Sequence, residues 1–421
     1  MARFDSLDGW LSWQEQFHPR PIDLGLERVA GVYACLDPNP RKIPTITVAG
    51  TNGKGSCVAY LEAIYRAQGY RVGAYTSPHI LKYNERIRIN GQPVSDEFIC
   101  AAFERIDAVR NDISLSYFEF GTLAALEIFS RNDVDVQILE VGLGGRLDAV
   151  NIIDADVAIV TTIAIDHIDW LGHTEEAIGV EKAGIFRPEK PAIVGDQGAP
   201  ASLIETAIEK QAELLQIGRS FTYSKLNDGW EWVSDGLKLS PLPDPGLKGE
   251  HQFRNAASVI MAVSCLQTRL PVDIEAIRQG LQTVQLKGRF QLISGEIPIL
   301  LDVGHNPQAV QTLLEYLERY FPSARIHAVF AMMKDKDIQG VLATMRKRVA
   351  QWYLAPLKNP RAADEELLKA YFYQQDIDNV NHGYANFLAA FDDARHYAQP
   401  GDLILIFGSF FLVSEYLSHF S

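Results

Sequence analysis

The chain of 421 residues is longer than one ordinary hydrophobic core supports, so we expect two domains. Hydrophobic residues make up 47% and charged residues 22%, which is the balance of a globular protein and excludes a disordered one. The 39 lysines and arginines against 53 aspartates and glutamates leave a net charge of −14 with no basic run, which excludes a typical nucleic-acid-binding protein.

Three further features concern the setting in which the chain works. The longest apolar runs, "AIVTTIAI" and "LILIF", are strand-sized, so no membrane span is expected. The N-terminal segment "MARFDSLDGWLSWQEQF" is polar and acidic with no apolar signal core, which predicts a cytoplasmic protein. The four cysteines lie far apart without a CxxC pair, which indicates reduced thiols and no zinc site (Cys35, Cys57, Cys100, Cys265).

From about residue 44 onward, short β-branched runs alternate with segments that carry apolar residues at helical spacing. The expected strands are "TITVAG", "RVGAYT", "VDVQILEVG", "DVAIVTTI" and "KPAIVGD". The expected helices between them are "CVAYLEAIYRAQG", "EFICAAFERIDAVR" and "EFGTLAALEIFSR". This alternation predicts a doubly wound α/β fold with a parallel sheet, and places ligands at the carboxyl ends of its strands.

The stretch from 215 to 250 breaks this rhythm. It is rich in aspartate, glycine and proline, which predicts a hairpin-like excursion and a long loop. Two helices are expected next, in "RNAASVIMAVSCLQ" and "DIEAIRQGLQTV", and the β/α rhythm then restarts with "IPILLDVGHNP", "RIHAVFAMMKDKD", "QWYLAPL" and "DLILIFGS". We therefore expect a first domain over 1–286, a linker over 287–297 and a smaller α/β domain over 298–421.

The segment "VAGTNGKGS" reads as a strand end, a glycine-rich turn and the start of a helix (Gly50, Gly53, Lys54, Gly55, Ser56). Glycines let the backbone approach phosphate oxygens, and the helix start offers unpaired N–H groups and a positive dipole end. Lys54 would reach the β/γ-phosphates and Ser56 would lie near Mg²⁺. The pattern is one residue shorter than GxxxxGK[ST], and an ordinary strand–helix turn is the alternative.

Polar residues at the ends of other expected strands suggest a metal site at the same edge (Ser77, Glu140, Asp148, Asp166, His167). Each has a structural alternative: Glu140 as a capped carboxylate and His167 as a satisfied core histidine, since Mg²⁺ prefers oxygen ligands. Lys182 follows on a short helix beside Glu181, and spacing alone favours a surface Lys/Glu pair there.

Taken together, these motifs resemble the dihydrofolate synthase/folylpolyglutamate synthases of the Mur-ligase superfamily, and most closely the bacterial bifunctional enzymes. The resemblance covers nearly the whole chain, with matching segments in order: "IDLGLERV", "TVAGTNGKGS", "YTSPHILKYNERIRING", "YFEFGTLAAL", "LEVGLGGRLDAVNIIDADVAIVTTIAIDHIDWLG", "EKAGIFR", "GRFQLI", "DVGHNP", "KDKD" and "FGSF". It implies an N-terminal P-loop ATPase domain with a parallel sheet, a linker, and a smaller Rossmann-like C-terminal domain.

By matching motifs, the resemblance assigns residues to ATP and to the metal. The ATP residues would be Gly53, Lys54, Gly55, Ser56, Asn255, Arg289 and Asp302. One or two Mg²⁺ ions would be held by Ser77, Glu140, His167 and a carbamylated Lys182. A desolvated lysine is neutral enough to react with CO₂, so this modification is chemically reasonable.

The resemblance also implies a pterin site, formed by Asp23, Leu24, Gly25, Leu26, Phe118, Glu119, Leu147, Asp148 and Ala149. Without the resemblance, "IDLGLERV" would read as a helix start capped by Asp23. The pterin segments favour use of 7,8-dihydropteroate as well as tetrahydrofolate derivatives, each joined to L-glutamate. They argue against a Mur-type ligase of peptidoglycan precursors.

The implied reaction is an ATP-dependent amide ligation through an acyl phosphate, with Lys54, Lys182, Asp302 and His305 in catalytic roles. The alternatives are a folylpolyglutamate synthase only, a dihydrofolate synthase only, or a P-loop regulatory NTPase. Three residues depart from the family pattern near the expected glutamate end (Gly304, Lys334, Phe411). We expect a monomer.

Overall fold

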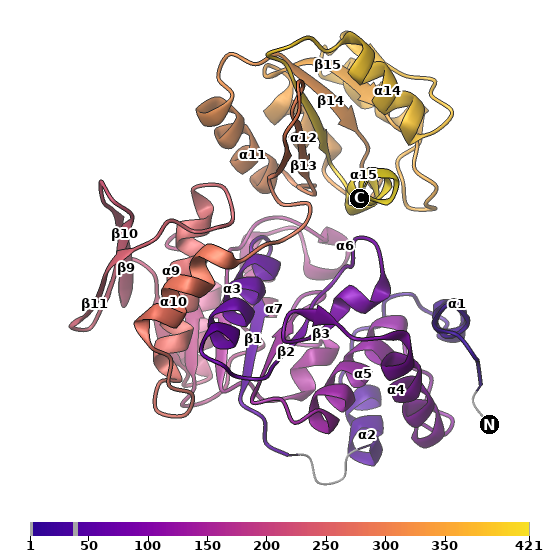
Figure 1. The fold of residues 1–421 in the computed structure, drawn as a ribbon. Helices are drawn as coiled ribbons and strands as arrows, with labels where there is room; N and C mark the ends of the chain where they lie inside the picture. Colours follow the sequence, from indigo (N-terminus) through magenta and orange to yellow (C-terminus); the bar gives the residue numbers. More distant parts are fainter. Residues whose placement is uncertain (1–2, 37–40, 421) are drawn as a thin grey trace. The chain divides into compact units, whose positions relative to one another are not determined.

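The computed structural model describes residues 3–36 and 41–420, which form two compact units. The first contains the chain up to Ile163, Trp170–Gly246 and Phe253–Val284. The second contains Ala164–Asp169, Leu247–Gln252 and Gln285–Ser421. Each unit is built around its own β-sheet (Figure 1).

The first unit has an eight-stranded sheet of order β4-β3-β2-β5-β1-β6-β7-β8. Its strands are β1 (Thr45–Ala49), β2 (Val72–Tyr75), β3 (Ile87–Ile89), β4 (Gln92–Pro93), β5 (Val136–Glu140), β6 (Val157–Val160), β7 (Pro191–Val194) and β8 (Glu213–Gln216). The β2–β3 and β3–β4 pairs are antiparallel, and the other neighbouring pairs of this sheet are parallel. The five strands expected from β-branched runs are therefore confirmed, as is the mostly parallel α/β fold.

The helices of this region are α1 (Leu7–Phe17), α2 (Glu27–Leu36), α3 (Lys54–Ala67), α4 (Asp96–Val109), α5 (Tyr117–Arg131), α6 (Ile168–Leu171), α7 (Glu175–Ala183), α8 (Ala201–Glu209), α9 (His251–Cys265) and α10 (Ile274–Thr283), with 3₁₀ turns η1 (Tyr83–Arg86) and η2 (Ala149–Ile152). N-terminal capping side chains explain where several of these helices begin. Ser116 and Glu119 form a capping box at α5, and Thr174 caps α7. A Cβ at Gly280 of α10 would lie 2.5 Å from Ile64 of α3, so glycine permits the close packing of these two helices.

The stretch from 215 to 250 contains more structure than the expected hairpin and loop. It forms a three-stranded antiparallel sheet of β9 (Phe221–Lys225), β10 (Trp230–Ser234) and β11 (Leu237–Leu242). Two buried tryptophans anchor it to α9: Trp232 donates to the carbonyl of Ala257, and the ring of Trp230 meets Phe253 edge-on. The sheet lies beside α9 and α10 in Figure 1.

The second unit has a six-stranded sheet of order β12-β13-β17-β14-β15-β16, parallel except for β12. Its strands are β12 (Gln291–Ile293), β13 (Ile299–Asp302), β14 (Ile326–Phe330), β15 (Val349–Leu354), β16 (Val380–Asn381) and β17 (Leu403–Phe407). Its helices are α11 (Pro307–Tyr320), α12 (Ile338–Met345), α13 (Glu365–Gln374), α14 (Phe387–Tyr397) and α15 (Phe410–Phe420). The core under α11, α12 and α13 contains Phe330, Trp352, Phe372 and Phe407. The restart of the β/α rhythm is thus confirmed.

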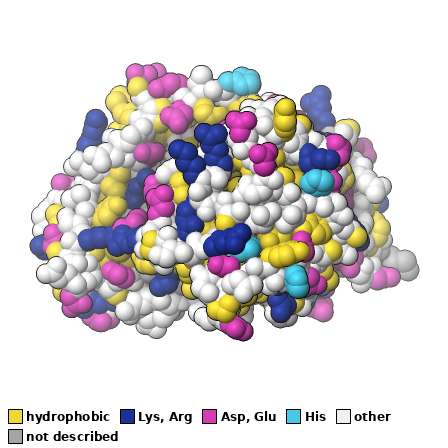
Figure 2. Space-filling model, turned by 90° about the horizontal axis from the view of Figure 1, so that it is seen from above, with side chains coloured by type: hydrophobic (Ala, Val, Ile, Leu, Met, Phe, Trp, Pro, Cys, Tyr) yellow, Lys and Arg dark blue, Asp and Glu magenta, His cyan; other side chains and the backbone are white. Residues whose placement is uncertain are grey.

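Two surface properties complete the description. Across the residues described, none of the helices has the length and apolar character needed to cross a bilayer. On the face shown in Figure 2, lysine and arginine side chains are interspersed with aspartate and glutamate.

Candidate active site

The glycine-rich loop joins β1 to α3 in a conformation that only glycine accommodates well. Gly50 has φ of +139°, and a Cβ there would lie 1.8 Å from Oγ1 of Thr161. Gly53 precedes α3 with φ of +92°, and a Cβ there would lie 2.8 Å from Oδ1 of Asn255. The end of β6 supports the loop, because the Thr161 hydroxyl donates to the carbonyl of Asn52 at 2.6 Å. The loop is therefore a strained turn that β6 supports and that leads directly into the start of α3.

Two lysines converge on one carbonyl of this loop. Nζ of Lys54 lies 2.9 Å from the Gly50 carbonyl oxygen, and Nζ of Lys182 lies 3.0 Å from the same atom. Lys182 is only 5% exposed, so the prediction of a surface Lys/Glu pair is wrong; its neighbour Glu181 instead binds Arg146 at 2.8 Å. Two ammonium groups gathered at a helix start favour a polyanionic ligand.

Oxygen ligands lie at the carboxyl edge of the same sheet. Glu140 ends β5 and is 5% exposed, and one of its carboxylate oxygens accepts the backbone N–H of Ser77 at 3.1 Å. Carboxylate and hydroxyl oxygens are the ligands that Mg²⁺ prefers, so this pair fits a hard cation. Within the described part of the chain, no group of three or more histidine, cysteine or acidic residues forms a complete metal cage.

His167 belongs to the second unit, where it lies in a cluster of polar side chains with Asp166 and Lys336. It has φ of +52°, and its Nε2 is 3.3 Å from Nζ of Lys336. Lys336 also binds Asp166 at 2.6 Å, and Asn306 donates to that carboxylate. Burial acts to raise the pKa of Asp166, but the charges of Lys336, His167 and His305 outweigh it and hold the pKa well below its usual range.

Asp302 ends β13 in the same unit, and His305 follows three residues later. Nδ1 of His305 donates to the carbonyl of Val303 at 2.9 Å, which leaves Nε2 as the acceptor. Burial and the charge of Lys336 lower the pKa of His305 to about 4, so the ring is neutral. Asp302 accepts the N–H groups of Phe290 and Gly304, and burial raises its pKa although Arg289 acts against the shift.

The residues assigned to the pterin end form a cluster in the first unit. Asp23 accepts from His18 at 3.0 Å and from Arg28 at 3.1 Å, and Arg28 also binds Glu119 at 3.1 Å. Because α2 begins at Glu27, Asp23 does not cap it, and the helix-cap reading of that segment is wrong. The hydrogen bond from His18, with the nearby arginines, lowers the pKa of Asp23.

Two further assigned groups lie around α5 and η2. Phe118 packs beside Tyr75 with ring centroids 5.8 Å apart, and the backbone of Gly142 passes so close that a Cβ there would lie 2.6 Å from the Phe118 ring. Asp148 caps η2 and accepts the N–H of Leu143, and burial raises its pKa to about 6. The remaining members Leu24, Gly25, Leu26 and Leu147 are half-buried, whereas Ala149 is buried.

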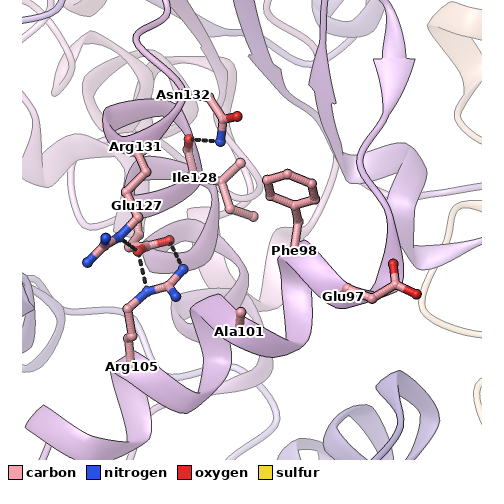
Figure 3. A pocket seen from close by; sticks show the side chains of 8 residues that line it. All are labelled: Glu97, Phe98, Ala101, Arg105, Glu127, Ile128, Arg131 and Asn132. Carbon is pink, nitrogen blue, oxygen red and sulfur yellow. Dashed lines mark hydrogen bonds and ion pairs between the residues drawn. The ribbon is translucent and has the colours of Figure 1, made fainter.

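A separate cavity of about 370 Å³ lies between α4 and α5 and contains none of these residues (Figure 3). It is lined by Glu97, Phe98, Ala101, Arg105, Glu127, Ile128, Arg131 and Asn132. Glu127 binds both Arg105 and Arg131, so the two arginines of this cavity share one carboxylate.

Comparison with known proteins decides the family. The Mur ligase middle domain matches residues 48–263, and the Mur ligase glutamate ligase domain matches residues 288–410. The dihydrofolate synthase/folylpolyglutamate synthase of Escherichia coli K12 is 44% identical over 410 residues, covering 97% of this chain and 94% of that protein. The chain belongs to the dihydrofolate synthase/folylpolyglutamate synthase family. It is accordingly an ATP-dependent enzyme that ligates glutamate to folates.

Solved structures agree with this family. E. coli FolC in complex with DHPP and ADP superposes with a TM-score of 0.93 at 43% identity, covering 99% of this chain and 97% of that one. A bifunctional folylpolyglutamate synthase/dihydrofolate synthase with Mn, AMPPNP and L-glutamate bound gives 0.91 at 43% identity, covering 99% and 98%. Relatives therefore bind a nucleotide, a divalent metal and glutamate on this fold.

Sequence reasoning missed several residues of this folate enzyme. His18, Arg28, Lys336 and the pair His79–Arg86 were not assigned, although all but His18 lie in motifs that carry the resemblance. Of the residues that depart from the family pattern, Lys334 donates to the carbonyl of Pro360, and Phe411 is exposed at the start of α15. Which contacts they make with glutamate stays a prediction.

Proposed function

We propose that the enzyme transfers the γ-phosphoryl group of ATP to the carboxylate of 7,8-dihydropteroate or of a reduced folate. The α-amine of L-glutamate then attacks the acyl phosphate, and phosphate leaves as the amide forms. The observation that carries this proposal is the convergence of Lys54 and Lys182 on the Gly50 carbonyl. Two anionic reactants must approach each other there, and the positive charge of Lys54, together with that of a bound metal ion, would lower this barrier.

The residues proposed for the nucleotide fall into two groups. Gly53, Lys54, Gly55 and Ser56 would bind the phosphates through loop N–H groups, the ammonium and the hydroxyl. Asn255, 3% exposed and adjacent to Gly53, and the pair Arg289 and Asp302 would contact the rest of the nucleotide.

A bound Mg²⁺ would neutralise phosphate charge and polarise the phosphoryl oxygens. Ser77, Glu140 and His167 are its proposed ligands, and a carbamylated Lys182 would add an anionic oxygen for a second ion. The burial of Lys182 supports this, because desolvation favours the neutral amine that reacts with CO₂.

His305 would accept a proton from the attacking amine. Its neutral ring presents Nε2 as an acceptor, because Nδ1 donates to Val303. Asp302 would hold this loop in place through the backbone N–H groups that it accepts. At the other end of the acceptor, the pterin ring would bind among Asp23, Phe118 and Asp148.

The test is phosphate release by purified protein with Mg-ATP and glutamate, comparing 7,8-dihydropteroate with tetrahydrofolate. We expect both acceptors to stimulate release. Stimulation by tetrahydrofolate alone would leave a folylpolyglutamate synthase and overturn the assignment of Asp23 and its neighbours. Stimulation by dihydropteroate alone would leave a dihydrofolate synthase, and silence with both would contradict the proposal. Asp302→Ala should abolish product formation in a folded protein.

We further propose that the enzyme acts as a monomer, with residues 287–297 as the linker that precedes its C-terminal domain. The first compact unit ends at Val284 and the second continues from Gln285, which supports this position of the linker. Light scattering on the purified protein measures the molecular mass directly.

A further inference from the structure

Arg86 is a half-buried cation for which no carboxylate of the described residues provides an ion pair. Its guanidinium lies over the rings of Tyr83 and Tyr117, 5.5 Å from each centroid. Its acidic neighbour Glu85 is used elsewhere, since that carboxylate accepts backbone N–H groups at 2.8–2.9 Å (Ile80, Leu81, Lys82). The positive charge is thus held in a fixed place by aromatic faces.

Arg86 also fixes the tautomer of His79. Its Nε–H donates to Nδ1 of His79 at 2.9 Å, and an arginine nitrogen can only donate. The proton of the neutral imidazole is therefore on Nε2, so His79 presents an N–H of defined direction. The ring is half-buried and packs edge-on against Tyr83.

Within the first unit, contacts and chain neighbours connect the pair to both ends of the proposed acceptor site. His79 is two residues after Ser77, whose N–H is bound by Glu140. On the other side, Tyr117 begins α5 and is followed by Phe118, which is assigned to the pterin end. The pair is therefore connected both to the residues assigned to the metal and to the residue assigned to the pterin end.

We propose that His79 and Arg86 form a binding site for the reactive carboxylate of the acceptor. The Nε2–H of His79 donates to a carboxylate oxygen, while Arg86 orients the ring and supplies the positive charge. This inference rests on the proposed function. It adds a recognition element that dihydropteroate and reduced folates share, since each presents one carboxylate to the phosphates.

The test separates the two roles of the imidazole with amide isosteres. In His79→Asn, the amide oxygen replaces Nδ1 and keeps the contact with Arg86, but the Nε2 donor is lost. In His79→Gln, the amide nitrogen takes the place of Nε2 and keeps the donor. Arg86→Gln removes the charge, and Arg105→Gln, in the α4–α5 cavity, is the matched control. The KM for dihydropteroate, tetrahydrofolate and ATP is measured for each, with unfolding by urea as the check on folding.

We expect His79→Asn and Arg86→Gln to raise the KM for both acceptors about 10- to 100-fold, the range of a lost charge-assisted hydrogen bond, with the KM for ATP unchanged. His79→Gln should recover part of the loss, and Arg105→Gln should match wild type. Loss confined to tetrahydrofolate, or a wild-type KM in His79→Asn, would overturn the inference. If the wild-type protein uses neither acceptor, the proposed function itself fails.

Discussion

Replacing Gly53 with alanine is expected to weaken both the fold and nucleotide binding. At φ of +92° an L-residue costs about 1–2 kcal/mol. The new Cβ would lie 2.8 Å from Oδ1 of Asn255, so this buried amide must move, and disturbing its hydrogen bonds adds about 1–3 kcal/mol. The two costs predict a loss of about 2–5 kcal/mol in the free energy of unfolding. The displaced loop should also raise the KM for ATP at least about tenfold.

Gly69→Ala is the matched control for this change, because Gly69 follows the other end of α3. Its φ is +97°, but a Cβ there would meet no heavy atom within 4 Å. Only the backbone cost of about 1–2 kcal/mol should appear, with a wild-type KM for ATP. Urea unfolding measures the first quantity and ATP saturation of phosphate release the second. If both variants lose equal stability and keep the wild-type KM, the assignment of the loop to ATP is refuted.

Three other predictions follow from buried groups. Lys182→Met should reduce the rate of ligation about 10²- to 10³-fold without unfolding the protein. Glu181→Gln, which removes one partner of a partly exposed ion pair, should retain activity. Equal losses of phosphate release in the two variants would contradict the role of Lys182. Burial lowers the pKa of His327 from its usual 6.5, so the unfolded chain binds more protons and stability should fall as the pH drops below about 6.5. Urea unfolding at pH 7.5 and 5.5 should show less pH dependence in His327→Gln, and an unchanged dependence would exclude this histidine as the cause. Trp232→Phe removes the hydrogen bond to the Ala257 carbonyl and should cost about 1–3 kcal/mol, measured by urea unfolding; a cost near zero would show that β9–β11 does not depend on it.

Much of the fold was predictable because the signals are local. Buried strands such as β1 and β6 are short β-branched runs, and α4 and α5 carry apolar residues at helical spacing. The glycine-rich loop was equally readable, because positive φ at Gly53 demands glycine at that position. The family resemblance depended on the order of many such segments, and the comparisons confirm it.

Only the tertiary structure shows which residues that are distant in sequence contact one another. Spacing placed Lys182 on the surface, whereas α7 packs so that its ammonium reaches Gly50, 132 residues away. Arg28 binds Asp23, five residues away, and Glu119, 91 residues away. The stretch from 215 to 250 forms a sheet whose Trp232 is buried against α9. Sequence alone thus determined the elements, the phosphate-type loop and the family, since each depends on neighbouring residues. Burial and charge pairing depend on which elements meet, and no local pattern encodes that meeting.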